Sequence, residues 1–204
     1  MNSDIQFILG SSSPRRKELL ASLGVSFEVI KPGFEEVLGE NEKASDYVVR
    51  NAVGKVNWIV EHELDTREDS STQRTLVIGA DTVVVKDEEI LQKPKSEDEA
   101  RQMLGQLSGR SHNVMTGVCI ADYKSIDEVC FYQWYGKTEV VFKDLSAEEI
   151  SRYIATGEPM DKAGAYGIQH LGAYLVKEIN GSYTNVVGLP LTQLWESLQQ
   201  ITSQ

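Results

Sequence analysis

Cysteine is scarce in this chain: its 204 residues include only two, Cys119 and Cys130. Two thiols cannot build a disulfide framework, and this pair lacks the spacing of a metal site. Because each lies in an apolar stretch, we expect reduced thiols in the core of a protein from a reducing compartment. Long apolar runs are also missing, since none approaches the ~18 residues that a membrane span requires. Residues 1–9 include Asp4 and resemble no signal peptide, so a soluble cytoplasmic protein without a membrane partner is expected.

Positive charge is scarce as well, because 20 Lys and Arg residues face 31 Asp and Glu residues and the formal net charge is −11. Binding to nucleic acid through counterion release requires a basic face, so no nucleic-acid partner is expected. A small anionic ligand is compatible with this charge if a few cations gather around it or a metal ion assists. The composition is otherwise that of a globular chain, and we predict one domain over residues 1–204.

Several familiar motifs are absent. The sequence contains no G-x-x-x-x-G-K-[ST] phosphate-binding loop and no G-x-G-x-x-G dinucleotide fingerprint, and no serine lies in a G-x-S-x-G elbow. His62, His112 and His170 are too far apart in sequence to indicate a metal site, and we interpret them as structural or exposed.

Strand and helix patterns alternate along the chain, with a hairpin signal near its end. Apolar runs predict strands over residues 5–9, 25–30, 75–85, 113–122, 129–142, 173–179 and 183–187. Helical spacing, a Ser-Pro start and two Ser-x-x-Glu capping boxes predict helices over residues 15–23, 45–63, 96–107 and 146–156 and from 191. Asn180-Gly181 indicates a hairpin between the last two strands, and residues 65–73 read as an exposed loop. This order predicts an α/β protein with a mixed sheet flanked by helices.

The first candidate site is the serine-rich turn, Ser11 to Ser13, that joins a strand to a helix. Backbone N–H groups and the helix dipole favour an anion at such a helix start. Arg15 and Arg16 add forked hydrogen-bond donors suited to phosphate. The alternative is an ordinary N-cap turn with two solvated arginines, although cations are disfavoured at a helix N-terminus. Both interpretations stay open from the residues alone.

The second candidate is Asp81, which follows one apolar run and precedes another. A carboxylate between two strand segments is costly unless it lies at a strand end or binds something, and Gly79 allows a ligand or the backbone to approach closely. The alternative is an aspartate that caps a turn between two strands. Lys93 follows a predicted hairpin turn at 87–89 and would return to the same end of the sheet. Glu36 would join Asp81 in holding a hard cation such as Mg²⁺, or is simply solvated.

Residues 161–169 form a further candidate, a loop rich in small residues with polar side chains spaced through it. Such a loop suits a planar ligand, and its alternative interpretation is an ordinary glycine-rich connection.

Taken together, these segments resemble the Maf family, the septum-formation-associated nucleotide pyrophosphatases. The matching segments occur in family order and span nearly the whole chain: Ser11–Leu20, Arg50–Lys55, Gly79–Thr82, Lys93–Pro94, Asp161–Gln169 and Val187–Pro190. Any one of them is weak, but the set is specific. The resemblance implies an elongated Maf/ITPase-like α/β domain with a mixed sheet, two lobes, a central cleft and assembly as a homodimer.

The resemblance also implies an activity. A house-cleaning enzyme of this family would cut a nucleoside triphosphate between the α- and β-phosphates, releasing the monophosphate and pyrophosphate with a divalent metal cation, Mg²⁺ or Mn²⁺. By position, Asp81 would be the catalytic carboxylate and a metal ligand, and Glu36 would support the metal. The residues implied to face the phosphates are Ser11, Arg15, Arg16, Lys55 and Lys93.

Three specificity positions, Arg15, Thr82 and Gln169, resemble the subgroup that acts on dTTP and UTP. The subgroup that acts on 7-methylguanosine triphosphate carries Trp, Gln and Glu there. This chain departs from the pattern at His170, where glycine is usual, and at Gly54, inside the helix that presents Lys55. Two alternative functions stay open: a nucleotide-binding regulator of cell division without essential catalysis, and a house-cleaning hydrolase of purine triphosphates.

Overall fold

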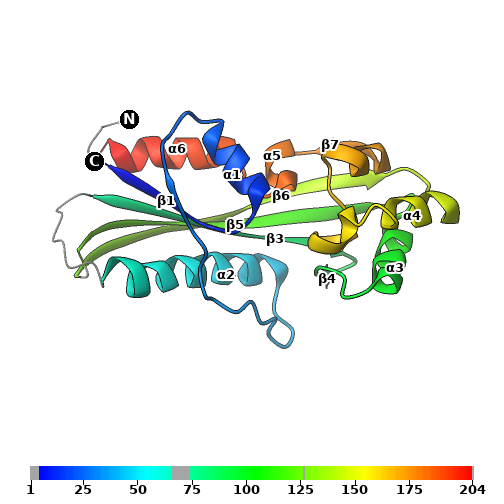
Figure 1. Cartoon of the computed structure of the whole chain (residues 1–204), viewed down its shortest axis with the longest axis horizontal. Coiled ribbons are helices and arrows are strands. Elements are labelled where there is room, and N and C mark those ends of the chain that lie inside the picture. The colour runs from blue at the N-terminus through cyan, green and yellow to red at the C-terminus, as the bar shows by residue number, and fades with distance from the viewer. Residues whose placement is uncertain (1–4, 66–73, 126, 204) are drawn as a thin grey trace. The chain divides into compact units, whose positions relative to one another are not determined.

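The computed structural model describes residues 5–65, 74–125 and 127–203 (Figure 1). The strands are β1 (Gln6–Gly10), β2 (Glu28–Ile30), β3 (Thr75–Lys86), β4 (Glu89–Leu91), β5 (Ser111–Ser125), β6 (Glu128–Phe142) and β7 (Val176–Asn180). The helices are α1 (Pro14–Ala21), α2 (Ala44–Ile59), α3 (Glu97–Leu107), α4 (Ala147–Ile154), α5 (Tyr183–Val187) and α6 (Leu191–Thr202). Of the predicted loop at 65–73, all but Asp65 lies outside the described residues.

The strands form one seven-stranded sheet in the order β2-β1-β3-β5-β6-β7, with β4 paired to β3. β1 is parallel to both β2 and β3, whereas β4 is antiparallel to β3 and β7 is antiparallel to β6. The predicted α/β fold with a mixed sheet flanked by helices is therefore confirmed.

The chain divides into two compact units. Unit 1 holds residues 1–81, 116–135 and 188–204, and unit 2 holds residues 82–115 and 136–187. β3, β5 and β6 contribute residues to both units.

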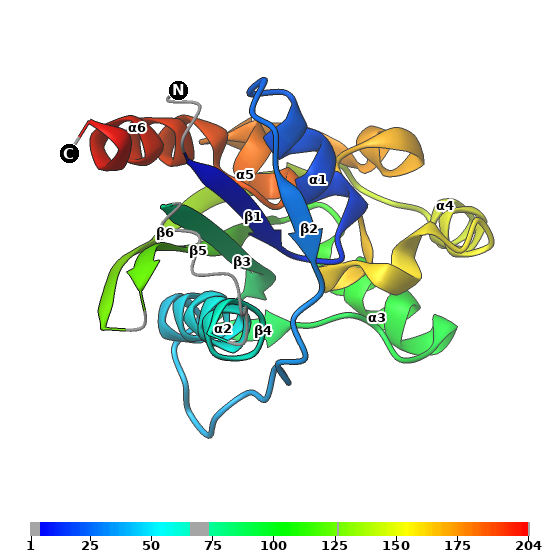
Figure 2. The same ribbon diagram turned by 60° about the vertical axis from the view of Figure 1, so that its left-hand side comes forward.

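Unit 1 is built as a sheet covered on both faces (Figure 2). Successive side chains of a strand point to opposite faces, so Phe7 and Leu9 of β1 pack with α1 and α6 while Ile8 packs with α2. Burial on both faces explains why β1 and the first half of β3 read as continuous apolar runs.

Unit 2 has a single apolar core. Helices α3 and α4 lie side by side (Figure 1), and they contribute Leu104, Leu107, Tyr153 and Ile154 to a cluster that also contains Phe142 of β6. Both helices begin as predicted, with Ser96 and Ser146 as N-caps. The full capping box is present only at Ser146, because the Glu99 carboxylate accepts the Lys95 N–H instead.

The strand predicted at residues 183–187 and the hairpin predicted at Asn180-Gly181 are both wrong. Residues 183–187 form the short helix α5, not a strand, so Asn180-Gly181 closes no hairpin. The Ser182 hydroxyl accepts the Asn185 N–H at 3.3 Å, and Thr138 of β6 bonds both backbone groups of Ser182. Helix capping and these tertiary contacts therefore overrule the local turn signal, and β7 pairs with β6 instead.

The prediction that both cysteines are core thiols is right for Cys119 and wrong for Cys130. Burial raises the pKa of the Cys119 thiol to about 12. Cys130 is exposed because the first half of β6 presents exposed or half-buried side chains throughout. Apolar composition does not distinguish a covered sheet face from an uncovered one.

The histidines are structural or exposed, as predicted. His62 and His170 are exposed, whereas His112 is buried in unit 2 with its Nε2 atom 2.7 Å from the Tyr166 hydroxyl. Burial, helped by the charge of Lys86, lowers the pKa of His112 to about 4 from its ordinary value of 6.5.

This lowered pKa predicts acid instability. Between pH 6.5 and about 4 the unfolded chain binds a proton at His112 that the folded chain does not, so the free energy of unfolding falls as the pH falls. We expect a loss of about 2 kcal/mol between pH 7.5 and pH 5 from this group alone. Urea denaturation at both pH values measures it. His112→Gln should remove most of this loss and exposed His62→Gln should not; an unchanged pH dependence in His112→Gln would contradict the assignment.

Candidate functional site

Asp81 lies inside an uninterrupted strand. β3 runs from Thr75 to Lys86 without a turn, and the Asp81 side chain is only 8% exposed. The interpretation of Asp81 as a turn cap is therefore wrong, and so is its placement at a strand end. Gly79 serves the close approach of a helix to the strand, since a Cβ atom there would lie 2.7 Å from the Ala52 carbonyl oxygen of α2.

Two side chains of α2 hold the Asp81 carboxylate. The Lys55 Nζ atom donates to Asp81 Oδ1 at 2.8 Å and to the Ala80 carbonyl at 3.1 Å, and the Asn51 Nδ2 atom donates to Asp81 Oδ2 at 2.9 Å. Residues four apart share one face of a helix, so α2 presents Asn51 and Lys55 together. Sequence reasoning did not single out Asn51. Its signal was a polar side chain one helical turn before Lys55, on the face that the apolar spacing predicts to be buried.

Glu36 reaches the same lysine from the loop 31–42. Its Oε1 atom lies 2.5 Å from Lys55 Nζ, and its side chain is 38% exposed. One ammonium group therefore neutralises two carboxylates, one buried and one partly open to solvent. This arrangement places a buried positive charge between two carboxylates in a chain whose net charge is negative.

The loop that carries Glu36 packs against α2 and is hydrogen-bonded to it. The Phe34 ring occupies the space over Gly54, where a Cβ atom would lie 2.3 Å from Phe34 Cε2. Arg50 donates to both carboxylate oxygens of Glu42, at 2.7 and 2.8 Å, and to the Val37 carbonyl at 2.7 Å. The hydrogen bond from Arg50 lowers the pKa of Glu42. Gly54 thus has a packing role.

This packing predicts an unusual response to Gly54→Ala. Alanine inside a helix normally stabilises by roughly 1 kcal/mol relative to glycine. Here the new Cβ atom would displace Phe34 and with it the loop of Glu36, so we expect a loss of about 1–3 kcal/mol, as for overpacking, and a lower kcat. Urea denaturation and steady-state assays measure both.

The matched control is Gly105→Ala in α3, where the new Cβ atom would meet no heavy atom of the described chain within 4 Å apart from its own chain neighbours and nearby backbone of the same helix. This change should stabilise the protein. Combining Gly54→Ala with Phe34→Ala should remove the clash; a stabilised, fully active Gly54→Ala single variant would contradict the packing role.

The start of α1 matches its prediction. Ser13 is the N-cap and Pro14 the first helical residue. Arg16 turns back across the helix start, where its Nε atom donates to the Gly188 carbonyl at 2.9 Å and its Nη1 atom to the Ser11 hydroxyl at 3.4 Å. Burial lowers the pKa of Arg16, while the carboxylates of Asp81 and Glu36 act in the opposite direction. Arg16 is thus not a solvated arginine, and it lies within electrostatic reach of both carboxylates.

The structure therefore brings five of the predicted residues together within unit 1: Ser11, Arg16, Glu36, Lys55 and Asp81. Arg15, next to Arg16 in the first turn of α1, is half-buried.

The other predicted residues belong to unit 2. Thr82 follows Asp81 in β3, and its side chain is half-buried. The predicted hairpin turn is confirmed: Asp87 and Glu88 adopt positive φ angles, and Val84 pairs with Leu91. Lys93, two residues beyond that pair, is exposed. The Oε1 atom of Gln169 is buried and has no hydrogen-bond partner among the described residues.

The fit of a divalent cation can be tested on these side chains. Within the described ranges there is no cluster of three or more His, Cys, Asp or Glu side chains that could hold a metal ion. Mg²⁺ usually takes one or two carboxylates and completes its shell with water and substrate phosphates. Asp81 and Glu36, both on Lys55, supply two carboxylates, and the buried Asn51 Oδ1 atom has no partner in the described chain. The residues fit a cation that binds together with a phosphate ligand.

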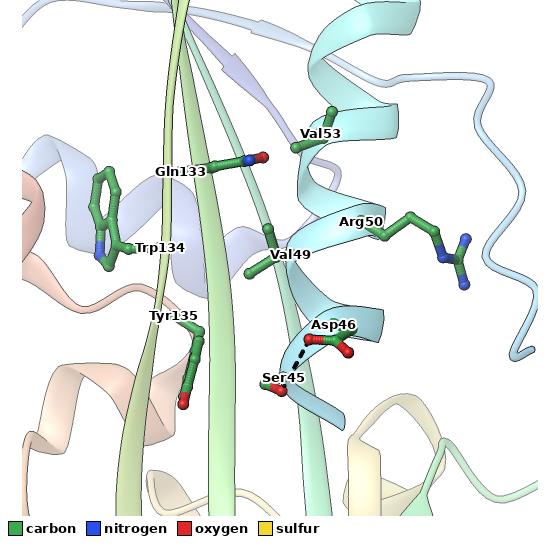
Figure 3. Close-up of a pocket in the computed structure, with 8 residues that line it drawn as sticks. All are labelled: Ser45, Asp46, Val49, Arg50, Val53, Gln133, Trp134 and Tyr135. Atoms are coloured by element: carbon green, nitrogen blue, oxygen red, sulfur yellow. Dashed lines mark hydrogen bonds between the residues drawn. The ribbon is translucent and has the colours of Figure 1, made fainter. Parts of the chain in front are cut away.

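A groove of about 690 Å³ lies between α2 and β6 in unit 1 (Figure 3). It is lined by Ser45, Asp46, Val49, Arg50, Val53, Gln133, Trp134 and Tyr135. Neither Asp81 nor Lys55 lines it. The groove is therefore separate from the charged cluster, by which we mean Arg16, Glu36, Lys55 and Asp81.

Comparisons with known proteins identify the family of this chain and its structural relatives. Residues 6–201 match the family model described as Maf-like protein. The chain is 46% identical over 195 residues to a dTTP/UTP pyrophosphatase of Shigella dysenteriae serotype 1, covering 96% of this chain and 92% of that protein. It is also 46% identical over 195 residues to a nucleoside triphosphate pyrophosphatase of Shigella flexneri, with the same coverage. The solved structure of a HAM1 protein from Coxiella burnetii is similar in fold, with a TM-score of 0.52, 14% identity, and coverage of 96% of this chain and 99% of that one.

Proposed function

Because the chain belongs to the Maf-like protein family, we propose that it is a nucleoside triphosphate pyrophosphatase that hydrolyses dTTP and UTP to the monophosphate and pyrophosphate. Relatives at 46% identity over nearly the whole chain bear the names dTTP/UTP pyrophosphatase and nucleoside triphosphate pyrophosphatase. The observation that carries the proposal is the buried Asp81 carboxylate, held by Lys55 and Asn51 and accompanied by Glu36 and Arg16. A protein that only binds nucleotides needs no such carboxylate pair.

Each residue of the charged cluster has a role in this reaction. Glu36 and Asp81 would hold the cation, Mg²⁺ or Mn²⁺, which when bound would neutralise phosphate charge and lower the pKa of a water molecule. Asp81 either takes the proton of the attacking water or serves mainly as a metal ligand. Arg16 and Lys55 stabilise the negative charge that develops on the phosphoryl oxygens.

The remaining phosphate contacts are proposed from the family resemblance. Ser11 and Arg15 lie at the start of α1, where backbone N–H groups favour an anion. Lys93 is exposed at the end of the hairpin of unit 2, and its ammonium group is open to a ligand.

The proposed base contacts are Arg15, Thr82 and Gln169. The Oε1 atom of Gln169, buried and without a partner in the described residues, is an acceptor for the N3–H group of uracil or thymine. Since these bases differ by one methyl group, which a pocket weighs by only about 1–3 kcal/mol, dTTP and UTP should be comparable substrates.

Cytosine tests this assignment, because its N3 atom carries no proton and its C4 carries an amino group. We expect CTP to be the poorer pyrimidine substrate and purine triphosphates to be excluded by size. Gln169→Glu removes the amide donor and adds a charge, so it should lower kcat/KM for UTP by about 10–100-fold with little effect on thermal stability. A preference for CTP in the wild type, or a silent Gln169→Glu, would refute the pocket while leaving the reaction type intact.

The decisive experiment is a panel of nucleoside triphosphates with Mg²⁺ or Mn²⁺, assayed for pyrophosphate and monophosphate. Turnover of dTTP and UTP supports the proposal. Binding without turnover would favour the cell-division regulator, and faster hydrolysis of inosine triphosphate would favour a purine-triphosphate hydrolase.

Homodimeric assembly and a central cleft, implied by the family resemblance, stay predictions, and light scattering of the purified protein tests the first. In the part of the chain that the structure describes, no helix has both the length and the apolar character needed to span a membrane.

A further inference from the structure

The segment that carries Gln169 is folded tightly back on itself. Gly167 and Gly172 approach so closely that a Cβ atom on Gly172 would lie 2.1 Å from the Gly167 carbonyl oxygen. Ala165 and His170 have φ angles of 61° and 51°, in the left-handed region that residues with a side chain rarely adopt. Such backbone persists only where surrounding contacts impose it.

Two side chains from the preceding segment impose it. The Tyr153 hydroxyl of α4 accepts the Gly167 N–H at 3.2 Å and donates to Glu158 Oε1 at 2.9 Å. Glu158 in turn accepts the Leu171 N–H on Oε2 and the Gly172 N–H on Oε1, each at 3.3 Å. Tyr153 and Glu158 thus hold the segment at both of its ends.

Burial keeps the Tyr153 hydroxyl in its protonated form. Tyr153 is 1% exposed, and burial raises the pKa of its phenol well above the ordinary value, with the Glu158 charge adding to the effect. The hydroxyl is therefore protonated at neutral pH and donates to Glu158. Lys162 also packs against Gly167, where a Cβ atom would lie 2.8 Å from its Cε atom, and its Nζ donates to the Glu158 carbonyl at 2.6 Å.

Gln169 lies between Gly167 and Leu171, whose backbone N–H groups are both bonded, and only Ile168 and His170 separate it from them. A hydrogen bond to a base weakens steeply when its distance or angle departs from the optimum, so the backbone of this short span decides where the Gln169 amide can be. We infer that Tyr153 and Glu158 are positioning residues for base selection, acting through Gln169 on uracil and thymine. This inference rests on the proposed function of Gln169.

The experiment compares kcat/KM for UTP and CTP in Tyr153→Phe and Glu158→Gln. We expect each variant to lower kcat/KM for UTP by about tenfold and kcat/KM for CTP much less, so that the UTP-to-CTP ratio falls. A purely structural role would lower both values by the same factor and leave the ratio unchanged, which would overturn the inference.

Matched controls come from the same unit. Tyr174→Phe removes a tyrosine hydroxyl that donates to the Glu149 carbonyl at 3.4 Å, and Glu148→Gln changes an 83% exposed carboxylate of α4. Both should leave the ratio at the wild-type value.

A double-mutant cycle completes the test. In a Gln169→Ala background, Tyr153→Phe should no longer change the ratio, because the side chain through which it acts is gone. A further fall of the ratio in that background would contradict the inference. If Tyr153→Phe fails to fold, the same comparison is made with Glu158→Gln, alone and combined with Gln169→Ala. A wild-type protein without preference for UTP would instead refute the proposed role of Gln169 in base selection, and a wild type without pyrophosphatase activity would refute the proposed function, so these failures are distinguishable.

Discussion

Asp81→Asn is expected to reduce pyrophosphate release from UTP by about 10²–10⁴-fold without unfolding the protein. The amide keeps the size of the carboxylate, but it neither holds a cation with a full charge nor accepts a proton from water. Because Lys55 retains Glu36 as a partner, the substitution leaves no buried ammonium group unpaired. Steady-state assays with Mg²⁺ and thermal unfolding measure the two quantities.

The matched control is Asp122→Asn, another buried carboxylate of unit 1. Asp122 accepts two hydrogen bonds from Arg74, at 2.8 and 2.7 Å, and it has no role in the proposed reaction. Asp122→Asn should lower stability and leave kcat close to wild type. Activity of Asp81→Asn within a few-fold of wild type would contradict the assignment of Asp81 as the catalytic carboxylate.

Lys55→Met is expected to damage both stability and turnover. The thioether replaces the ammonium group that neutralises Asp81 and Glu36, so two carboxylates are left facing each other without their shared cation. Removing one partner of a buried ion pair typically costs about 3–5 kcal/mol, and we expect the lower end because Glu36 is partly exposed. The kcat for UTP should fall by about 10²-fold or more, as when one charge-stabilising donor is lost.

Urea denaturation and pyrophosphate assays test this expectation against Lys124→Met. Lys124 pairs with Glu128 on the surface, where the two side chains are 50% and 60% exposed. Such an exposed pair contributes little to stability, so Lys124→Met should be nearly silent. A Lys55→Met variant that is as stable and active as the control would show that Lys55 neutralises nothing essential.

Local sequence rules predicted helix starts correctly where the stabilising hydrogen bonds join residues close in sequence. Ser13-Pro14 and Ser146-x-x-Glu149 marked helix starts because a side chain bonds backbone groups within one turn. The same rules failed at residues 183–187, since contacts of Ser182 with Thr138, 44 residues away in the chain, decide that conformation.

Sequence by itself determined the mixed α/β fold and the order of most elements, because apolar periodicity and helix caps are properties of neighbouring residues. It determined the family through the ordered set of motifs along the chain. It also supplied Asp81, Lys55, Glu36 and Arg16 as candidates. Only the tertiary structure decided that Asp81 lies within a continuous strand, that Asn51 is its second partner, and that Gly54 makes room for Phe34. The last two depend on how α2 packs against β3 and against the loop 31–42, and the geometry of that packing is set by side-chain volume and burial rather than by local pattern.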